Sequence, residues 1–306
     1  MKKCIMIMNP ESGKEKKLKS FEDFYDIFRK YGYDLDIIFT RKRNDAKKII
    51  QSLDDNIDLV ISAGGDGTLN EIIGGNILRK KPLTIGPLPL GSTNDIGKMV
   101  GLDKDVYQNL EYLLQGEIKK IDICSINHTP FVYVACLGDY TDMAYKTPRE
   151  LKKKYGRVAY ILYGLKHITK KINKYQVKYK VNDIEKEGEF SFFFITNSSR
   201  VAGQPDIYED IKLDDNMFEV AMAKVTNKKD MLRMLVMVTT MDIKDIPGIT
   251  YYQTNHFQIE FLNPIKSSWC IDGEEYKKDT TIFDFKINES INMLLPKENL
   301  KKLFLK

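Results

Sequence analysis

The sequence has 306 residues, 42% of them hydrophobic, and a net charge of +5. This length allows two domains with separate cores, and the hydrophobic share excludes a disordered or fibrous chain. The small positive surplus does not indicate a nucleic-acid partner, so none is expected. No apolar run reaches the roughly 20 residues of a transmembrane helix, and the scattered cysteines fit a reducing cytoplasm better than a disulfide framework or a zinc site.

The first 120 residues alternate between strand-like and helical patterns. Apolar runs of strand length occupy residues 4–8, 36–40, 58–62 and 83–88. Between them, residues 18–31, 45–53 and 69–79 have apolar side chains at steps of three and four, which predicts helices. This alternation predicts a parallel sheet covered on both faces, with a binding edge at the carboxyl ends of its strands.

From about Ile121 the pattern changes to short segments rich in Tyr, Phe, Val and Ile. They predict a mostly antiparallel β domain, with a turn at Asn182 and Asp183 and helices near residues 148–173 and 227–240. The last residues, 298–306, are expected to pack back as a short helix or strand. We therefore expect an α/β protein with domain boundaries at 1–121, 122–290 and 291–306.

Two loops of the first domain have small residues where a strand hands over to a helix. The loop "NPESGK", residues 9–14, leaves backbone N–H groups free to meet an anion, but it lacks Walker A spacing and alone indicates only an ordinary turn. The loop "AGGDGTLNE", residues 63–71, lacks the third small residue of a dinucleotide fingerprint. Thr68 and Glu71 can be interpreted as a capping box, and the glycines as turn formers.

Asp66 does not fit that simple interpretation, because a carboxylate in a phosphate loop repels the phosphate. It suits the position if it acts through a divalent cation or a water bound to that cation. A third loop, "PLGSTND" at residues 89–95, also ends a strand with small residues and finishes in an acid, Asp95. The two acid-bearing loops predict a shared site for nucleotide phosphates and Mg²⁺.

A basic stretch lies between Lys146 and Lys174. It contains ten Lys or Arg residues against one acid, Glu150, with aromatic and aliphatic residues interleaved. A solvated helix face and a surface that binds anionic membranes explain this pattern equally well.

The three loops, in this order and at these distances, resemble those of bacterial diacylglycerol kinase and related lipid kinases, a group that includes sphingosine and ceramide kinases. Further similar segments are "ELKKKYGRVAYIL" (150–162), "NSSRVAGQPDIYEDIKLDDNMFEV" (197–220) and "CIDGEEY" (270–276). GGDGT alone also occurs in NAD kinases and phosphofructokinases, whereas "GSTND" and the later segments narrow the resemblance to lipid kinases.

The resemblance implies a nucleotide cleft between the α/β domain and a β-sandwich domain that takes the lipid substrate. It implies that Asp66 and Asp95 order Mg²⁺ and its waters, and that Glu274, with Asp272 alongside, accepts the proton of the attacking hydroxyl. The residues implied to hold ATP are Asn9, Pro10, Glu11, Ser12, Gly13, Thr40, Gly65, Asp66, Gly67, Thr68, Leu69, Asn70, Glu71 and Ser92.

The resemblance also implies a metal site in the segment "KLDDNMF". Asp215 would offer its carboxylate there, and Lys212 and Met217 their backbone carbonyls. This chain has Asn216 where the family usually has Gly. Asn tolerates a left-handed backbone better than most residues, so the turn can form.

The expected function is that of an ATP- and Mg²⁺-dependent kinase of diacylglycerol or a related lipid alcohol, cytoplasmic and peripherally bound to the inner membrane face. Lys152, Lys153, Lys154 and Arg157 are expected to help dock it on an anionic surface. Two alternatives stay open. One is a kinase of a soluble substrate such as NAD, and the other is a non-catalytic nucleotide-binding regulator that docks on membranes.

Overall fold

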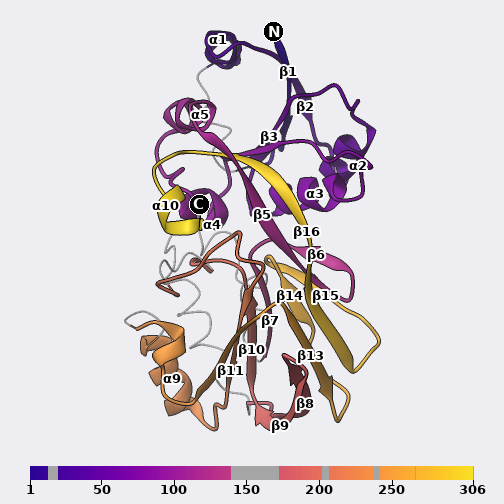
Figure 1. Ribbon diagram of the computed structural model, residues 1–306, viewed down its shortest axis with the longest axis vertical. Coiled ribbons are helices and arrows are strands. Elements are labelled where there is room, and N and C mark those ends of the chain that lie inside the picture. Colours follow the sequence, from indigo (N-terminus) through magenta and orange to yellow (C-terminus); the bar gives the residue numbers. More distant parts are fainter. Residues whose placement is uncertain (13–19, 139–171, 202–206, 238–240, 266, 306) are drawn as a thin grey trace. The chain divides into compact units, whose positions relative to one another are not determined.

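The computed structural model describes residues 1–12, 20–138, 172–201, 207–237, 241–265 and 267–305 (Figure 1). The chain forms two compact units. The first contains Met1–Asp122, Lys212–Asp215 and Glu289–Lys306, and the second contains Ile123–Ile211 and Asn216–Asn288.

The first unit is built on a parallel sheet with the strand order β2-β1-β3-β4. Its strands are β1 (Lys2–Met8), β2 (Tyr33–Phe39), β3 (Leu59–Gly64) and β4 (Ile85–Pro89). Its helices are α1 (Glu22–Lys30), α2 (Asp45–Ser52), α3 (Asp66–Asn76), α4 (Asp95–Met99), α5 (Val106–Leu114) and α10 (Leu300–Leu303). The predicted alternation of strands and helices is confirmed, with ends that differ by a few residues.

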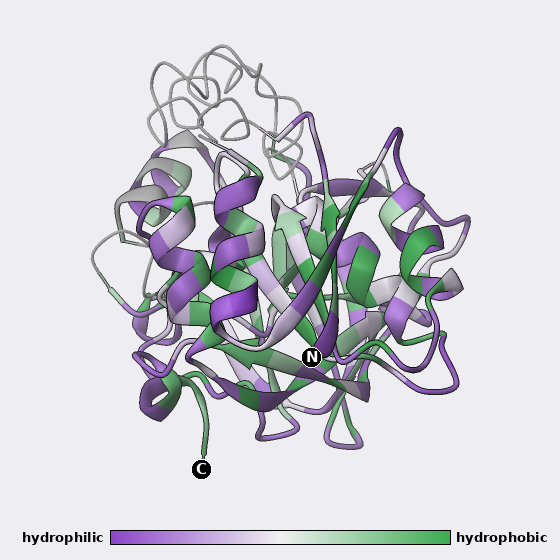
Figure 2. Cartoon of the chain, turned by 90° about the horizontal axis from the view of Figure 1, so that it is seen from above, coloured by the Kyte–Doolittle hydropathy of each residue, from purple (hydrophilic) through white to green (hydrophobic). Residues whose placement is uncertain are grey.

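The hydrophobic pattern explains how these elements pack. Most of β1 and all of β3 are buried, as expected for central strands of a parallel sheet. The helices α1 and α2 each bury one face, through Phe24 and Phe28 and through Ala46 and Ile50. Figure 2 shows hydrophobic and hydrophilic residues together on these helices, as expected when one face meets the core and the other meets water.

Two prolines limit the pairing of β4. The Thr84 carbonyl accepts a hydrogen bond from β3, and the Leu90 N–H donates one to the end of β3. Backbone groups of successive residues point to opposite sides of a strand, so those of Pro87 and Pro89 point away from β3. On that side β16 (Ile282–Leu295) pairs in parallel only where Met293 meets Ile85. Among the described residues no strand pairs with this side of β4 beyond that point, toward its carboxyl end, where proline has no N–H to donate.

Segments distant in sequence complete the first unit. Leu213 accepts a hydrogen bond from the N–H of Asp122 (2.8 Å) and donates its own N–H to the carbonyl of Leu303 (2.8 Å). The Lys212 ammonium donates to the Lys302 carbonyl at 2.6 Å. The short segment 212–215 is thereby held between the end of the N-terminal region and α10.

The second unit contains two antiparallel sheets, α9 (Lys228–Met237) and the 3₁₀ helix η2 (Ile243–Asp245). One sheet has the order β12-β11-β10-β7-β14-β15, and the other contains β16, β13, β8 and β9 in this order, with β5 beside β16 and β6 beside β5. The bounds are β5 (Glu117–Ile126), β6 (Thr129–Phe131), β7 (Val134–Gly138), β8 (Tyr175–Val181), β9 (Ile184–Phe190), β10 (Phe192–Thr196), β11 (Phe218–Ala223), β12 (Ile249–Thr254), β13 (His256–Phe261), β14 (Trp269–Ile271) and β15 (Glu274–Tyr276).

The core of this unit lies between the two sheets. Phe193 and Trp269 of one sheet pack in the same cluster as Phe257 and Phe283 of the other, and all four are buried. This is the arrangement of a β-sandwich, so the expected fold class is confirmed. The turn predicted at Asn182 and Asp183 is also confirmed, because both residues have positive φ (49° and 66°) between β8 and β9.

Candidate functional site

The strand order places a topological switch point between β1 and β3. After β1 the chain passes to β2 on one side of β1, whereas β3 and β4 lie on the other side of β1. The loops that follow β1 and β3 therefore start at neighbouring strand ends and run in opposite directions. Ligands of open parallel sheets bind at such points. Asn9, which follows β1, donates its N–H to the Ala63 carbonyl (3.0 Å) and its side-chain amide to the Thr68 hydroxyl (3.3 Å). The two loops are thereby joined.

The capping-box interpretation of Thr68 and Glu71 is wrong. Helix α3 begins at Asp66 with Gly65 at its N-cap, so Thr68 lies inside the first turn. Its hydroxyl accepts the amide of Asn9, and the Glu71 carboxylate accepts the N–H of Asn44 at 2.8 Å. Both side chains therefore connect α3 to neighbouring loops instead of satisfying the helix start.

The loop after β4 lies directly against the loop after β3. The N–H groups of Leu90 and Gly91 both donate to the Gly64 carbonyl, at 2.7 and 3.2 Å. A Cβ atom on Gly91 would lie 2.6 Å from the Gly65 Cα, a distance that real Cβ atoms do not adopt. Glycine at position 91 thus permits a contact between two backbones.

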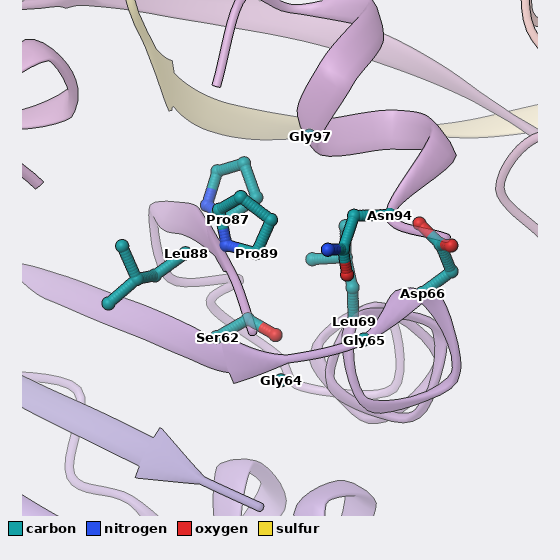
Figure 3. Close-up of a pocket in the computed structure, with 10 residues that line it drawn as sticks. All are labelled: Ser62, Gly64, Gly65, Asp66, Leu69, Pro87, Leu88, Pro89, Asn94 and Gly97. Carbon is teal, nitrogen blue, oxygen red and sulfur yellow. The ribbon is translucent and has the colours of Figure 1, made fainter. Parts of the chain in front are cut away.

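This contact brings Asp66, drawn in Figure 3, to the start of α4, where the second predicted acid, Asp95, lies. The Asp66 carboxylate accepts the N–H of Asp95 at 3.0 Å and that of Ile96 at 3.3 Å, so it satisfies the start of α4. Asp95 is completely buried and Asp66 partly buried. Burial raises the pKa of Asp66, although the backbone N–H groups and nearby Lys98 act in the opposite direction.

The other residues predicted to hold ATP lie around the same strand ends. Thr40 follows β2, is buried and donates its N–H to the Met8 carbonyl at 2.9 Å. Ser12 is also buried, and its N–H donates to Asn9. Pro10, Glu11, Gly67 and Ser92 are exposed, Asn70 is partly buried and Leu69 is buried, while Gly13 lies outside the described residues.

Asp272, in the second unit, has a structural role in a hairpin. Asp272 and Gly273 join β14 to β15 with positive φ at both positions (48° and 87°), as in a type I′ turn. The Asp272 carboxylate accepts three backbone N–H groups, those of Val132 (2.7 Å), Tyr133 (3.0 Å) and Val134 (3.0 Å). These bonds fix the turn that carries Glu274, whose side chain is exposed at the start of β15.

The predicted metal segment has the backbone turn that its sequence requires. Asn216 adopts a left-handed conformation with φ 57°, as the glycine usual in the family would. Lys212 and Asp215 belong to the first unit and Met217 to the second. Within the part of the chain that the structure describes, no three His, Cys, Asp or Glu side chains gather to hold a metal ion.

The first unit also resembles a known protein family. Residues 3–126 match the family described as "Diacylglycerol kinase catalytic domain". This region is similar to that family. A diacylglycerol kinase of Staphylococcus aureus is 29% identical over 275 residues, which cover 89% of this chain and 86% of that protein. The enzyme of the same name from Staphylococcus saprophyticus is 27% identical over 274 residues, 89% of each chain.

The fold of the whole chain is also that of a solved kinase. A crystal structure of a diacylglycerol kinase from Bacillus anthracis superposes with a TM-score of 0.77 at 21% identity and covers 98% of this chain and 99% of that one. The resemblance inferred from the motifs is therefore confirmed. No helix among the described residues is both long and apolar enough to cross a bilayer.

Two features of the first unit were not singled out from its sequence. Gly91 makes the backbone contact, and Asn94 turns the chain with φ 53° while its amide donates to the Gly91 carbonyl at 2.7 Å. Both lie in "PLGSTND", so the motif contained the signal. The basic residues Lys152, Lys153, Lys154 and Arg157 lie outside the described residues.

We expect Gly91→Ala to destabilise the first unit by about 1–3 kcal/mol, because its Cβ has to displace the Gly65 backbone. Gly67→Ala is the matched control, since a Cβ there meets nothing within 4 Å in the first turn of α3. Urea unfolding measures both. Equal stability of the two variants would contradict the close backbone contact.

Asp66 is expected to make stability depend on pH when no divalent cation is present. Its pKa is raised by folding, so the folded chain binds more protons than the unfolded chain above pH 4, and stability falls as pH rises through this window. A tenfold difference in proton affinity between the folded and unfolded chains corresponds to about 1.4 kcal/mol. The free energy of unfolding of Asp66→Asn minus that of the native chain should therefore rise with pH and then level off. A difference that stays constant from pH 4 to 8 would show that the Asp66 pKa is not raised.

Proposed function

We propose that the chain is an ATP- and Mg²⁺-dependent lipid kinase that transfers the γ-phosphoryl group of ATP to the hydroxyl of diacylglycerol or a related lipid. The observation that carries the proposal is the pairing of Asp66 with the start of α4 at a switch point of a parallel sheet. Partial burial of a charged carboxylate in a glycine-rich loop costs free energy, and a cation bound beside the carboxylate offsets that cost.

The residues at this point fit a nucleotide with Mg²⁺. The Asp66 carboxylate accepts the N–H groups of Asp95 and Ile96, and a carboxylate has about four acceptor positions, so it can also accept a hydrogen bond from a cation-bound water. Asp95 supplies a second carboxylate on the same loop pair. We propose that residues 9–12, the start of α3, Thr40 and Ser92 bind ATP. Mg²⁺, when bound, supplies charge neutralisation on the phosphates.

The proton acceptor in this proposal is Glu274. Its side chain is exposed on β15, and the hairpin that carries it is fixed by Asp272. A new bond forms between the lipid hydroxyl oxygen and the γ-phosphorus as the bond from that phosphorus to the bridging oxygen of ADP breaks. The hydroxyl proton passes to Glu274. Asp272 then acts as a positioning residue, because its oxygens already accept three N–H groups.

The lipid substrate resides in a bilayer, so the proposed enzyme works at a membrane surface from the cytoplasmic side. We propose that the basic and aromatic stretch between Lys146 and Lys174 contacts anionic headgroups. Each cation near such a surface contributes about 1 kcal/mol of attraction. The enzyme would associate peripherally with the inner face of the membrane.

A phosphorylation assay with labelled ATP and Mg²⁺ tests the function. Diacylglycerol, ceramide and sphingosine are offered in vesicles, and NAD is offered in solution. We expect transfer to a lipid, faster on anionic than on zwitterionic vesicles. Asp66→Ala should lower the rate by about 10²–10³-fold, and Glu274→Gln by about 10²–10⁴-fold without a change in Tm. Phosphorylation of NAD alone would replace the proposal by a soluble kinase, and ATP binding without any transfer would favour a regulator.

We propose a second metal site formed by the carboxylate of Asp215 and the carbonyls of Lys212 and Met217. Without ATP, a chelator should lower the Tm of the native chain, whereas Asp215→Ala should start lower and not respond. A metal at a hundredfold excess over its Kd adds about 2.7 kcal/mol. Asp66→Ala is the control and should keep the response. A chelator effect that disappears in Asp66→Ala but persists in Asp215→Ala would assign the metal to the nucleotide site instead.

A further inference from the structure

A small cavity lies beside Asp66, between the ends of β3 and β4 and the starts of α3 and α4 (Figure 3). Its volume is about 10 Å³, close to the space that one water molecule occupies. Ser62, Pro87 and Pro89 line it from the sheet, and Asn94 lines it from the loop after β4.

Two polar atoms at this cavity are buried without a protein partner. The Ser62 Oγ and the Asn94 Oδ1 have no hydrogen-bond partner among the described residues, and both side chains are only 2% exposed. In Figure 3 the two side chains point into the same space. The Asn94 amide nitrogen is already used, because it donates to the Gly91 carbonyl at 2.7 Å. Buried oxygens of this kind are nearly always hydrogen-bonded in folded proteins.

The chemistry of the two atoms selects the ligand. The Asn94 Oδ1 can only accept a hydrogen bond, whereas the Ser62 hydroxyl can donate or accept one. A water molecule can donate to both oxygens, or donate to Asn94 and accept from Ser62. A metal cation needs more oxygen ligands than these two side chains supply. We propose that the cavity binds one water molecule that bridges Ser62 Oγ to Asn94 Oδ1.

This bridge makes Ser62 a positioning residue for Asp66 and Asp95. Asn94 holds the left-handed turn, with φ 53°, and the next two residues, Asp95 and Ile96, donate their N–H groups to Asp66. The water ties this turn to β3, a strand that is buried along its whole length. Its catalytic consequence rests on the proposed function, whereas the water and its structural role do not.

A crystal structure at high resolution tests the water directly. The native chain should show one water within hydrogen-bond distance of both oxygens, and Ser62→Ala should lose its density or leave it poorly ordered. Native density that lacks a water in contact with both atoms would overturn the proposal.

A double-mutant cycle tests the bridge in solution. Ser62→Ala and Asn94→Gly should each lower the Tm, and glycine keeps the left-handed backbone accessible. Because both lose the same bridge, the double variant should lose clearly less than the sum of the two single losses. Ser52→Ala is the control for removal of a hydroxyl, since its Oγ donates on the exposed side of α2, to the Ile49 carbonyl. Strictly additive losses, or a Ser62→Ala melt equal to that of Ser52→Ala, would overturn the proposal.

Kinetics test the consequence for the active enzyme. Ser62→Ala should raise the KM for Mg-ATP several-fold and change kcat less, because Asp66 and Asp95 are displaced but both carboxylates are still present. An unchanged KM would reject the positioning role. If the native chain transfers phosphate to no substrate, the proposed function fails, while the density and the cycle still decide the water.

Discussion

The hydrogen bonds from the N–H groups of Asp95 and Ile96 to the Asp66 carboxylate are the constraint on which the site depends. They join the loop after β3 to the loop after β4 and satisfy the start of α4. Charge-assisted hydrogen bonds of this kind are stronger than neutral ones, yet burial still raises the pKa of Asp66. The group is therefore held in place while its charge is only partly compensated. A bound cation would compensate the remaining negative charge of this carboxylate.

The glycines around Asp66 have a clear purpose in this arrangement. Gly65 and Gly91 let two backbones approach, so that the acid of one loop reaches the N–H groups of the next. The second unit uses the same principle with other residues. There the Asp272 carboxylate collects three N–H groups from residues 132–134 and fixes the turn before Glu274. In both places a carboxylate organises loops by accepting backbone N–H groups, and in the second unit the exposed Glu274 follows directly after that turn.

Local sequence patterns predicted the fold well where the decisive interactions are local. Apolar runs located β1 to β4, and the Asn182–Asp183 pair located a turn. The helix start at Asp66 was misjudged, because Thr68 and Glu71 fit a capping box while their actual partners, Asn9 and Asn44, lie far away in the chain. The donors to Asp272 are about 140 positions distant, so no local pattern could identify them. The assignments of nucleotide, metal and membrane contacts remain predictions.

The segments that complete the first unit bear on how the protein folds as it is synthesised. Four residues far from the N-terminal region in sequence are buried in that unit, namely Leu295, Leu300, Leu303 and Phe304. Leu213 bridges them to Asp122, so residues 1–122 leave the ribosome without the partners that cover part of their core. Contacts so distant in sequence form slowly. An emerging N-terminal region therefore exposes apolar surface until residues 295–304 have been made, and an excised fragment of residues 1–122 would carry the same exposed surface permanently.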